Sequence, residues 1–120
     1  MTQFALKDAH VINASAVRYI FETADADAVR AAVHAFFAWR GYALEEGTAA
    51  NGVYGKGSAV SRALLGGLAT RFKFNVAVYA GDGITLVDFS KGMAGILGGG
   101  LGVTRMNKEF AAIQAELKAL

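Results

Sequence analysis

The sequence predicts a single α+β domain over residues 1–120, with an antiparallel sheet of about five strands and two helices packed on one face. Two stretches alternate apolar and polar residues with a period of two, which is typical of half-buried strands. Two others repeat apolar residues every three or four positions, as one face of a helix does. The pairs Asn51-Gly52 and Asp82-Gly83 favour tight turns and therefore predict two hairpins. The expected element order is β-α-β-β-β-β-α.

The amino-terminal part predicts an arm, a strand and a helix. Residues 1–13 show little periodicity, so we expect a loosely attached arm there. A strand begins at Ala16, where β-forming residues alternate with polar ones. Residues 23–27 then supply helix caps and first-turn acids, and Gly41 ends the helix after Arg40. Its expected apolar face consists of Val29, Ala32, Val33, Phe36, Phe37 and Trp39.

Two hairpins follow in the prediction. In the first, the strands 42–47 and 53–58 flank Asn51-Gly52, which would form a type I′ turn with positive φ at both positions. In the second, the strands 71–80 and 84–91 flank Asp82-Gly83. Matching of the apolar residues selects one register for this second hairpin. The expected pairs are Val78 with Val87, Val76 with Phe89, Ala77 with Asp88, and Asn75 with Ser90.

Two further helices are predicted. A short one between the hairpins would be capped by Ser58 and would place Val60, Leu64, Leu65 and Leu68 on one side. The last helix would start at Thr104 as its N-cap. Its apolar stripe consists of Val103, Met106, Phe110, Ile113, Leu117 and Leu120.

This element order resembles the fold of the TATA-box-binding-protein-like superfamily, and more loosely the helix-grip architecture of Bet v 1-like proteins. The resemblance covers most of the chain, but it concerns element order and no motif carries it. These folds include nucleic-acid binders, lipid binders and enzymes, so the resemblance implies no function.

The composition excludes several classes of protein. Twelve Lys and Arg stand against ten Asp and Glu, giving a net charge of +2 that is spread along the chain, so no nucleic-acid partner is expected. There is no cysteine, and no histidine pair has metal-ligand spacing, so neither a metal nor a cofactor is predicted. No secretory signal or membrane-spanning segment is visible, which makes the cytoplasm the expected location.

Two glycine-rich apolar segments are the most unusual feature of the chain. One contains Leu64, Leu65, Gly66 and Gly67; the other contains Met93, Ile96, Leu97, Gly98, Gly99, Gly100 and Leu101. Such segments either pack closely within the domain or contact an apolar small molecule, a membrane surface or another protomer. A weaker alternative is anion binding by the glycines that precede the last helix, with Arg105 nearby.

One polar constellation is also predicted. Lys73, Asn75, Asp88 and Ser90 should share the polar face of the sheet, with Arg18 and Glu22 adjoining. This face is either a solvated surface with cross-strand ion pairs or the floor of a small polar pocket. His10 and His34 are expected on the surface.

These features lead to three hypotheses. The first is a noncatalytic binding domain that uses the glycine-rich segments. The second is a small enzyme that uses Lys73, Asp88 or a histidine in a cleft between the sheet and the last helix. The third is an assembly subunit that forms a homo-oligomer by pairing the stripe Phe110, Ile113 and Leu117 between chains.

Overall fold

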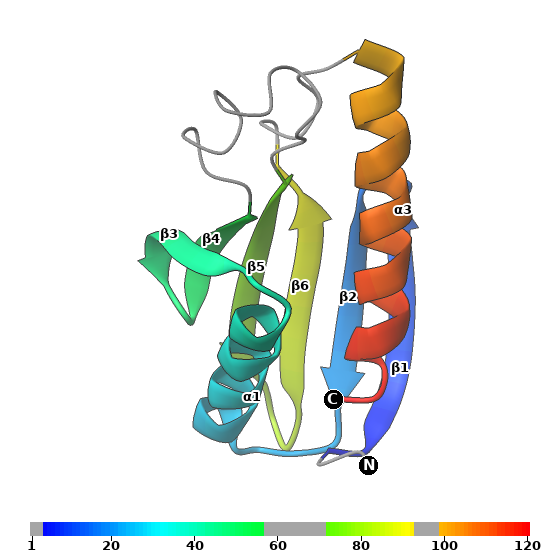
Figure 1. Ribbon diagram of the computed structural model, residues 1–120. Coiled ribbons are helices and arrows are strands. Elements are labelled where there is room, and N and C mark those ends of the chain that lie inside the picture. The colour runs from blue at the N-terminus through cyan, green and yellow to red at the C-terminus, as the bar shows by residue number, and fades with distance from the viewer. Residues whose placement is uncertain (1–3, 57–71, 93–98) are drawn as a thin grey trace.

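The described part of the protein is a six-stranded antiparallel sheet with two helices on one face (Figure 1). The computed structural model describes residues 4–56, 72–92 and 99–120, and in the last range the side chains from Thr104 onward. The strands are β1 (Leu6–Asn13), β2 (Ala16–Phe21), β3 (Ala43–Thr48), β4 (Asn51–Lys56), β5 (Phe72–Ala80) and β6 (Thr85–Lys91). The helices are α1 (Ala26–Trp39) and α3 (Gly99–Leu117). The strands lie in the order β1-β2-β6-β5-β4-β3.

The predicted α+β class and antiparallel sheet are confirmed, but the sheet has one strand more than expected. Residues 6–13 form β1 rather than a loose arm, and β1 pairs antiparallel with β2. β1 is an edge strand whose side chains are mostly exposed, including Val11 at 57% and Ile12 at 49%. A strand without a buried face needs no apolar alternation, which is why its sequence gave no signal.

Helix α1 begins and ends close to the predicted positions. The Asp25 side chain accepts a hydrogen bond of 3.0 Å from the amide of Ala28 and so caps the first turn. At the other end Gly41 has a φ of +93°, its amide donates to Ala38, and the amide of Tyr42 donates to Phe37. These two bonds form the Schellman arrangement in which glycine is favoured.

The prediction that Trp39 belongs to the buried face of α1 is wrong, because its side chain is 79% exposed. Phe37 belongs to the buried face of α1, and its side chain is fully buried in the core. Two positions further on, a side chain points about 200° round the helix axis, which directs Trp39 away from the sheet.

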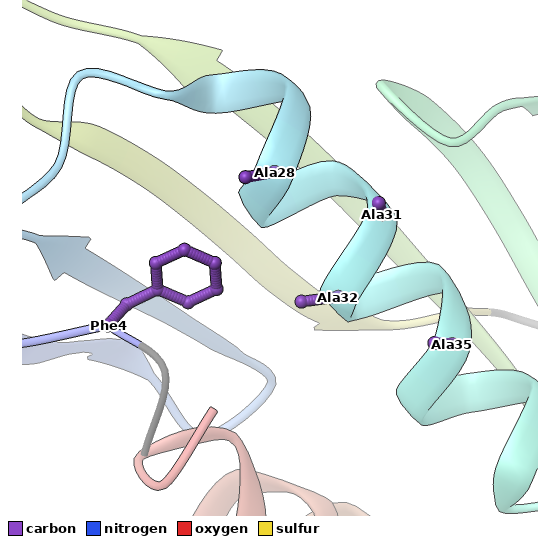
Figure 2. A pocket seen from close by; sticks show the side chains of 5 residues that line it. All are labelled: Phe4, Ala28, Ala31, Ala32 and Ala35. Carbon is purple, nitrogen blue, oxygen red and sulfur yellow. The ribbon is translucent and has the colours of Figure 1, made fainter.

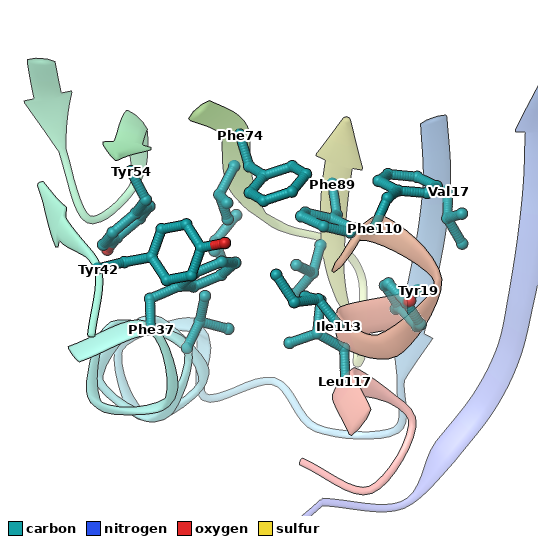
Figure 3. Packing of buried hydrophobic residues seen from close by; sticks show 14 of the residues in the cluster. Val17, Tyr19, Phe37, Tyr42, Tyr54, Phe74, Phe89, Phe110, Ile113 and Leu117 are labelled. Atoms are coloured by element: carbon teal, nitrogen blue, oxygen red, sulfur yellow. The ribbon is translucent and has the colours of Figure 1, made fainter. Parts of the chain in front are cut away.

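Aromatic rings from both helices meet on a single strand at the centre of the core (Figure 3). The ring of Phe89 on β6 lies 6.0 Å from that of Phe37 on α1 and 4.8 Å from that of Phe110 on α3. Phe74 on the neighbouring strand lies 5.1 Å from Phe89. Both helices therefore cover the same face of the sheet, as predicted.

The hairpin of β5 and β6 has the predicted register. Val78 pairs with Val87, Val76 with Phe89, Ala77 with Asp88, and Asn75 with Ser90. The turn between the two strands is formed by Asp82 and Gly83. The amide of Gly81 donates to the carbonyl of Ile84 across this turn, and Gly83 has a φ of +72°.

The hairpin of β3 and β4 exists, but its turn is not at Asn51-Gly52. Thr48 pairs with Asn51, so the two turn residues are Ala49 and Ala50, and Gly52 lies within β4. A Cβ atom on Gly52 would lie 2.4 Å from the carbonyl oxygen of Thr48. Close approach of the two strands, rather than a positive φ, is therefore what requires glycine at this position.

Replacing Gly52 by alanine is expected to lower the free energy of unfolding by about 1–3 kcal/mol, because the added methyl group cannot fit against β3. Replacing its neighbour Asn51 by alanine is the matched control and should cost under about 0.5 kcal/mol, since its side chain is exposed. Urea denaturation measures both changes. A larger loss for Asn51→Ala would instead place these two residues in the turn.

Helix α3 starts earlier than predicted. Thr104 lies inside the helix and is not its N-cap, because the helical backbone already begins at Gly99. The apolar stripe is confirmed at Met106, Phe110, Ile113 and Leu117, which are all buried. Leu120 lies beyond the end of the helix and is only partly buried against the core. The stripe packs inside the domain, which contradicts the hypothesis that it pairs between chains.

Candidate functional site

The predicted contact residues of the glycine-rich segments fall mostly outside the described part of the chain. This holds for Leu64, Leu65, Gly66, Gly67, Met93, Ile96, Leu97 and Gly98. Gly99, Gly100 and Leu101 form the first turn of α3 instead of the predicted loop.

The residues that flank both segments lie together at one end of the sheet (Figure 1). Lys56 precedes the first segment, Phe72 follows it, and these two residues pair across β4 and β5. Gly92 precedes the second segment, and its amide donates a hydrogen bond of 2.8 Å to the carbonyl of Lys73. Gly99 follows this segment and begins α3. We call the region at Lys56, Phe72, Gly92 and the start of α3 the glycine-rich end.

Basic side chains surround this end of the sheet. The ammonium of Lys56 donates to the carbonyl of Arg40 at 3.1 Å and lies over the ring of Tyr42. Lys91 donates to the Asn107 side chain at 2.6 Å and lies 5.0 Å from the centroid of the Phe110 ring. These contacts hold the two ammonium groups on aromatic faces. The charge of Lys56 also helps to lower the pKa of the nearby Glu109 carboxylate.

The predicted polar face of the sheet exists, and it is the face opposite the helices. Arg18 on β2 and Asp88 on β6 face each other and form two hydrogen bonds of 2.7 and 2.8 Å. These bonds and the charge of Asp88 raise the pKa of Arg18 above its ordinary value. The Asp88 carboxylate therefore forms an ion pair with Arg18, the residue that was predicted to adjoin the polar face.

The other members of this face do not converge on Asp88. Asn75 pairs with Ser90 on the neighbouring strand. Lys73 lies two residues before Asn75, nearer the glycine-rich end, and its ammonium is 3.6 Å from the carboxylate of Glu45. The arrangement is a series of cross-strand pairs along the strands. It supports the interpretation of a solvated surface more than that of a pocket floor.

A partly buried network of four residues links the connection between α1 and β3 to α3. Glu109 accepts hydrogen bonds from Arg40 at 2.7 Å and from the Tyr42 hydroxyl at 2.5 Å, and Arg40 also donates to Glu116 at 2.6 Å. Burial alone would raise the pKa of Glu109, but the hydrogen bonds from Arg40 and Tyr42 outweigh it and lower that pKa. Burial, with the Glu109 contact, raises the pKa of Tyr42, so its hydroxyl keeps the proton that it donates.

This network was not predicted, because no local pattern connects residues that are 67 to 69 positions apart. Its carboxylate also borders an open hollow of about 340 Å³ beside the start of β5. The lining residues are Arg40, Phe72, Arg105, Lys108, Glu109 and Ala112. The hollow therefore lies next to the glycine-rich end and has a mainly basic rim.

A second, larger hollow lies at the opposite end of α1 (Figure 2). It measures about 660 Å³, and it is lined by Phe4, Ala28, Ala31, Ala32 and Ala35. It is shallow, and all five lining side chains are apolar, so none of these side chains can orient a ligand by a hydrogen bond.

The two histidines lie on the surface, as predicted. His34 is exposed on α1, and its Nδ1 atom lies 2.9 Å from the hydroxyl of Tyr54 on β4. Burial raises the pKa of Tyr54, so its phenol is neutral, and the tautomer of His34 decides which of the two groups donates. His10 lies on the edge strand β1, opposite Arg18.

The described ranges of the chain contain neither a membrane-spanning helix nor a cluster of metal ligands. No helix there is both long and apolar enough to cross a membrane. No three acidic or histidine side chains in those ranges are grouped so that they could hold a metal ion.

Comparisons of the chain with models of protein families, with curated proteins and with solved structures found no match. Its function must therefore be argued from its own residues and geometry.

Proposed function

We propose that this chain is a noncatalytic binding domain that uses the glycine-rich end to contact an apolar partner. The observation that carries the proposal is that the described residues flanking both apolar segments lie at the same end of the sheet. Their flanking residues are joined there by the pairing of Lys56 with Phe72 and by the hydrogen bond between Gly92 and Lys73.

The composition of the two segments supports a contact role. Residues 57–71 and 93–98 contain leucine, isoleucine, valine and methionine among glycines, with arginine as their charged residue type and no acid. β4 and β6 finish at the same end of the sheet, because β5 between them runs in the opposite direction. This topology brings the flanks of the two segments side by side, as the parts of one contact surface must be.

The alternative, an enzyme with a polar site on the sheet face, has less support. Asp88, which it would use, is bound by two hydrogen bonds from Arg18. Lys73 lies beside Glu45 and on the side of the sheet that faces away from α3. These positions are far from a cleft between the sheet and the last helix.

The test replaces two apolar residues of the second segment, in the variant Ile96→Ser/Leu97→Ser. The wild-type protein should show one of three properties: self-association by light scattering, a copurified apolar molecule by native mass spectrometry, or flotation with lipid vesicles. The double variant should lose that property, because serine removes about 2 kcal/mol of apolar transfer free energy at each position.

The matched control is Tyr79→Ser, which removes a large side chain that is 46% exposed near the opposite end of the sheet. It should leave the property unchanged. A wild-type protein that is monomeric, carries no molecule and ignores vesicles would contradict the proposal.

A further inference from the structure

The charges of this chain are separated along the strands. Residues 56–73 and 89–108 carry seven Lys and Arg and no Asp or Glu, whereas the rest of the chain carries five Lys and Arg and all ten acidic residues. Most of the first group lies in or next to the elements that meet at the glycine-rich end. The net charge of +2 is therefore the sum of a basic end and a more acidic remainder.

The described basic residues of this end are Lys56, Lys73, Lys91, Arg105 and Lys108. Two carboxylates lie among them: Glu45 beside Lys73, and Glu109, which is paired with Arg40 and lies near Lys56. Arg105 and Lys108 are exposed on the first half of α3, and the start of that helix rises beyond the end of β6 (Figure 1). The positive end of the α3 dipole points the same way.

The opposite end of the sheet is acidic. Glu22 and Asp25 lie in the connection from β2 to α1, and Asp82 lies in the turn between β5 and β6. Thr85 joins these two connections by a hydrogen bond of 2.8 Å to the carbonyl of Thr23. Both described chain termini, near Phe4 and Leu120, lie at this end (Figure 1).

Exposed apolar side chains accompany the basic residues. The turn between β1 and β2 lies at the glycine-rich end, because the amide of Lys91 donates to the carbonyl of Ser15 at 2.9 Å. Val11 and Ile12, next to this turn, are both about half exposed. Aliphatic residues beside basic ones are typical of surfaces that enter the interface of a lipid bilayer.

From this arrangement, and resting on the proposed function, we infer that the glycine-rich end binds the surface of an anionic lipid bilayer. Acidic headgroups attract the lysine and arginine side chains, while the aliphatic residues enter the boundary between headgroups and acyl chains. A single-stranded nucleic acid would instead favour exposed aromatic rings for base stacking. The large exposed side chains next to the turn between β1 and β2, Val11 and Ile12, are aliphatic. Trp39 is exposed beside Arg40, whose carbonyl accepts from Lys56, and tryptophan is a residue type enriched at membrane interfaces.

The test compares two variants that each remove two positive charges. Arg105→Gln/Lys108→Gln removes them from the glycine-rich end, and Lys7→Gln/Lys118→Gln removes them from exposed positions at the other end. Both variants lower the net charge equally, and all four changes are on the surface. Circular dichroism and urea denaturation verify that both variants fold like the wild-type protein.

Flotation is measured with vesicles of phosphatidylcholine alone and of phosphatidylcholine mixed with phosphatidylglycerol. The wild-type protein should partition onto the mixed vesicles more strongly, and added salt should weaken this binding. Arg105→Gln/Lys108→Gln should lower the partition coefficient roughly 30-fold, at about 1 kcal/mol for each basic residue near the surface. Lys7→Gln/Lys118→Gln should leave it unchanged.

Four results would overturn the inference. Equal binding to both kinds of vesicle would agree with the apolar contact of the proposed function, but it would contradict the preference for anionic lipid. Equal loss in both variants would show that net charge, and not this end, drives binding. A single-stranded oligonucleotide that displaces the protein from mixed vesicles would identify a nucleic acid as the preferred partner. Absence of binding to any vesicle, together with self-association, would retain only the proposed function.

Discussion

Replacing Ile113 by aspartate is expected to remove about 5 kcal/mol from the free energy of unfolding, because it buries a charge without a partner. Ile113 is fully buried on α3. The loss is a large part of the roughly 5–15 kcal/mol that stabilises a typical domain. Circular dichroism should show a largely unfolded chain at neutral pH.

Two further variants serve as controls for this prediction. Ile113→Val should cost about 1 kcal/mol and remain measurable by urea denaturation. Ala111→Asp introduces the same charge at an exposed position of the same helix and should leave the domain folded. If Ile113→Asp stayed folded and only changed the mass in solution, the stripe would lie between chains and not in the core.

Replacing Glu109 by glutamine is expected to cost about 2 kcal/mol at neutral pH, because hydrogen bonds to a charged group are stronger than neutral ones. Glu109 accepts from both Arg40 and Tyr42, and its side chain is 14% exposed. Glu116→Gln is the matched control: it contacts the same Arg40, but its side chain is 44% exposed. An exposed pair of this kind contributes at most about 1 kcal/mol.

The effect of Glu109 should also depend on pH. Its pKa is lower in the folded protein than in the unfolded chain, so the unfolded chain takes up the proton first as the pH falls. The stabilisation is complete above the unfolded value of about 4.3 and is lost as the pH falls through the folded pKa. Urea denaturation of the wild type and Glu109→Gln should therefore converge in acid. A constant difference between them would show that shape, not charge, explains the loss.

The parts of the fold that the sequence predicted well are those in which one face is buried. Alternation in β5 and β6, together with a two-residue turn, leaves one register that keeps Val76 and Phe89 on the same face, and the structure has it. β1 escaped prediction because an exposed edge strand has no such alternation. The start of α3 was misplaced because glycines, which favour loops, form its first turn.

The candidate site could be predicted only in part. The glycine-rich segments are visible in the sequence, but their common location follows from strand pairing, which brings Lys56 beside Phe72. The basic end was missed because charges were weighed over the whole chain, although the two acid-free ranges could have revealed it. The network of Arg40, Tyr42 and Glu109 depends on tertiary contacts alone.

The two edges of the sheet suggest how this protein avoids aggregation. The pairing of β1 with β2 shifts register between Leu6 and Asp8 and again between Val11 and Asn13. The pairing of β3 with β4 shifts between Leu44 and Glu46. Irregular edge strands are poor templates for a further strand from another molecule. An open sheet of six strands with irregular edges is thus less prone to edge-to-edge stacking into fibrils.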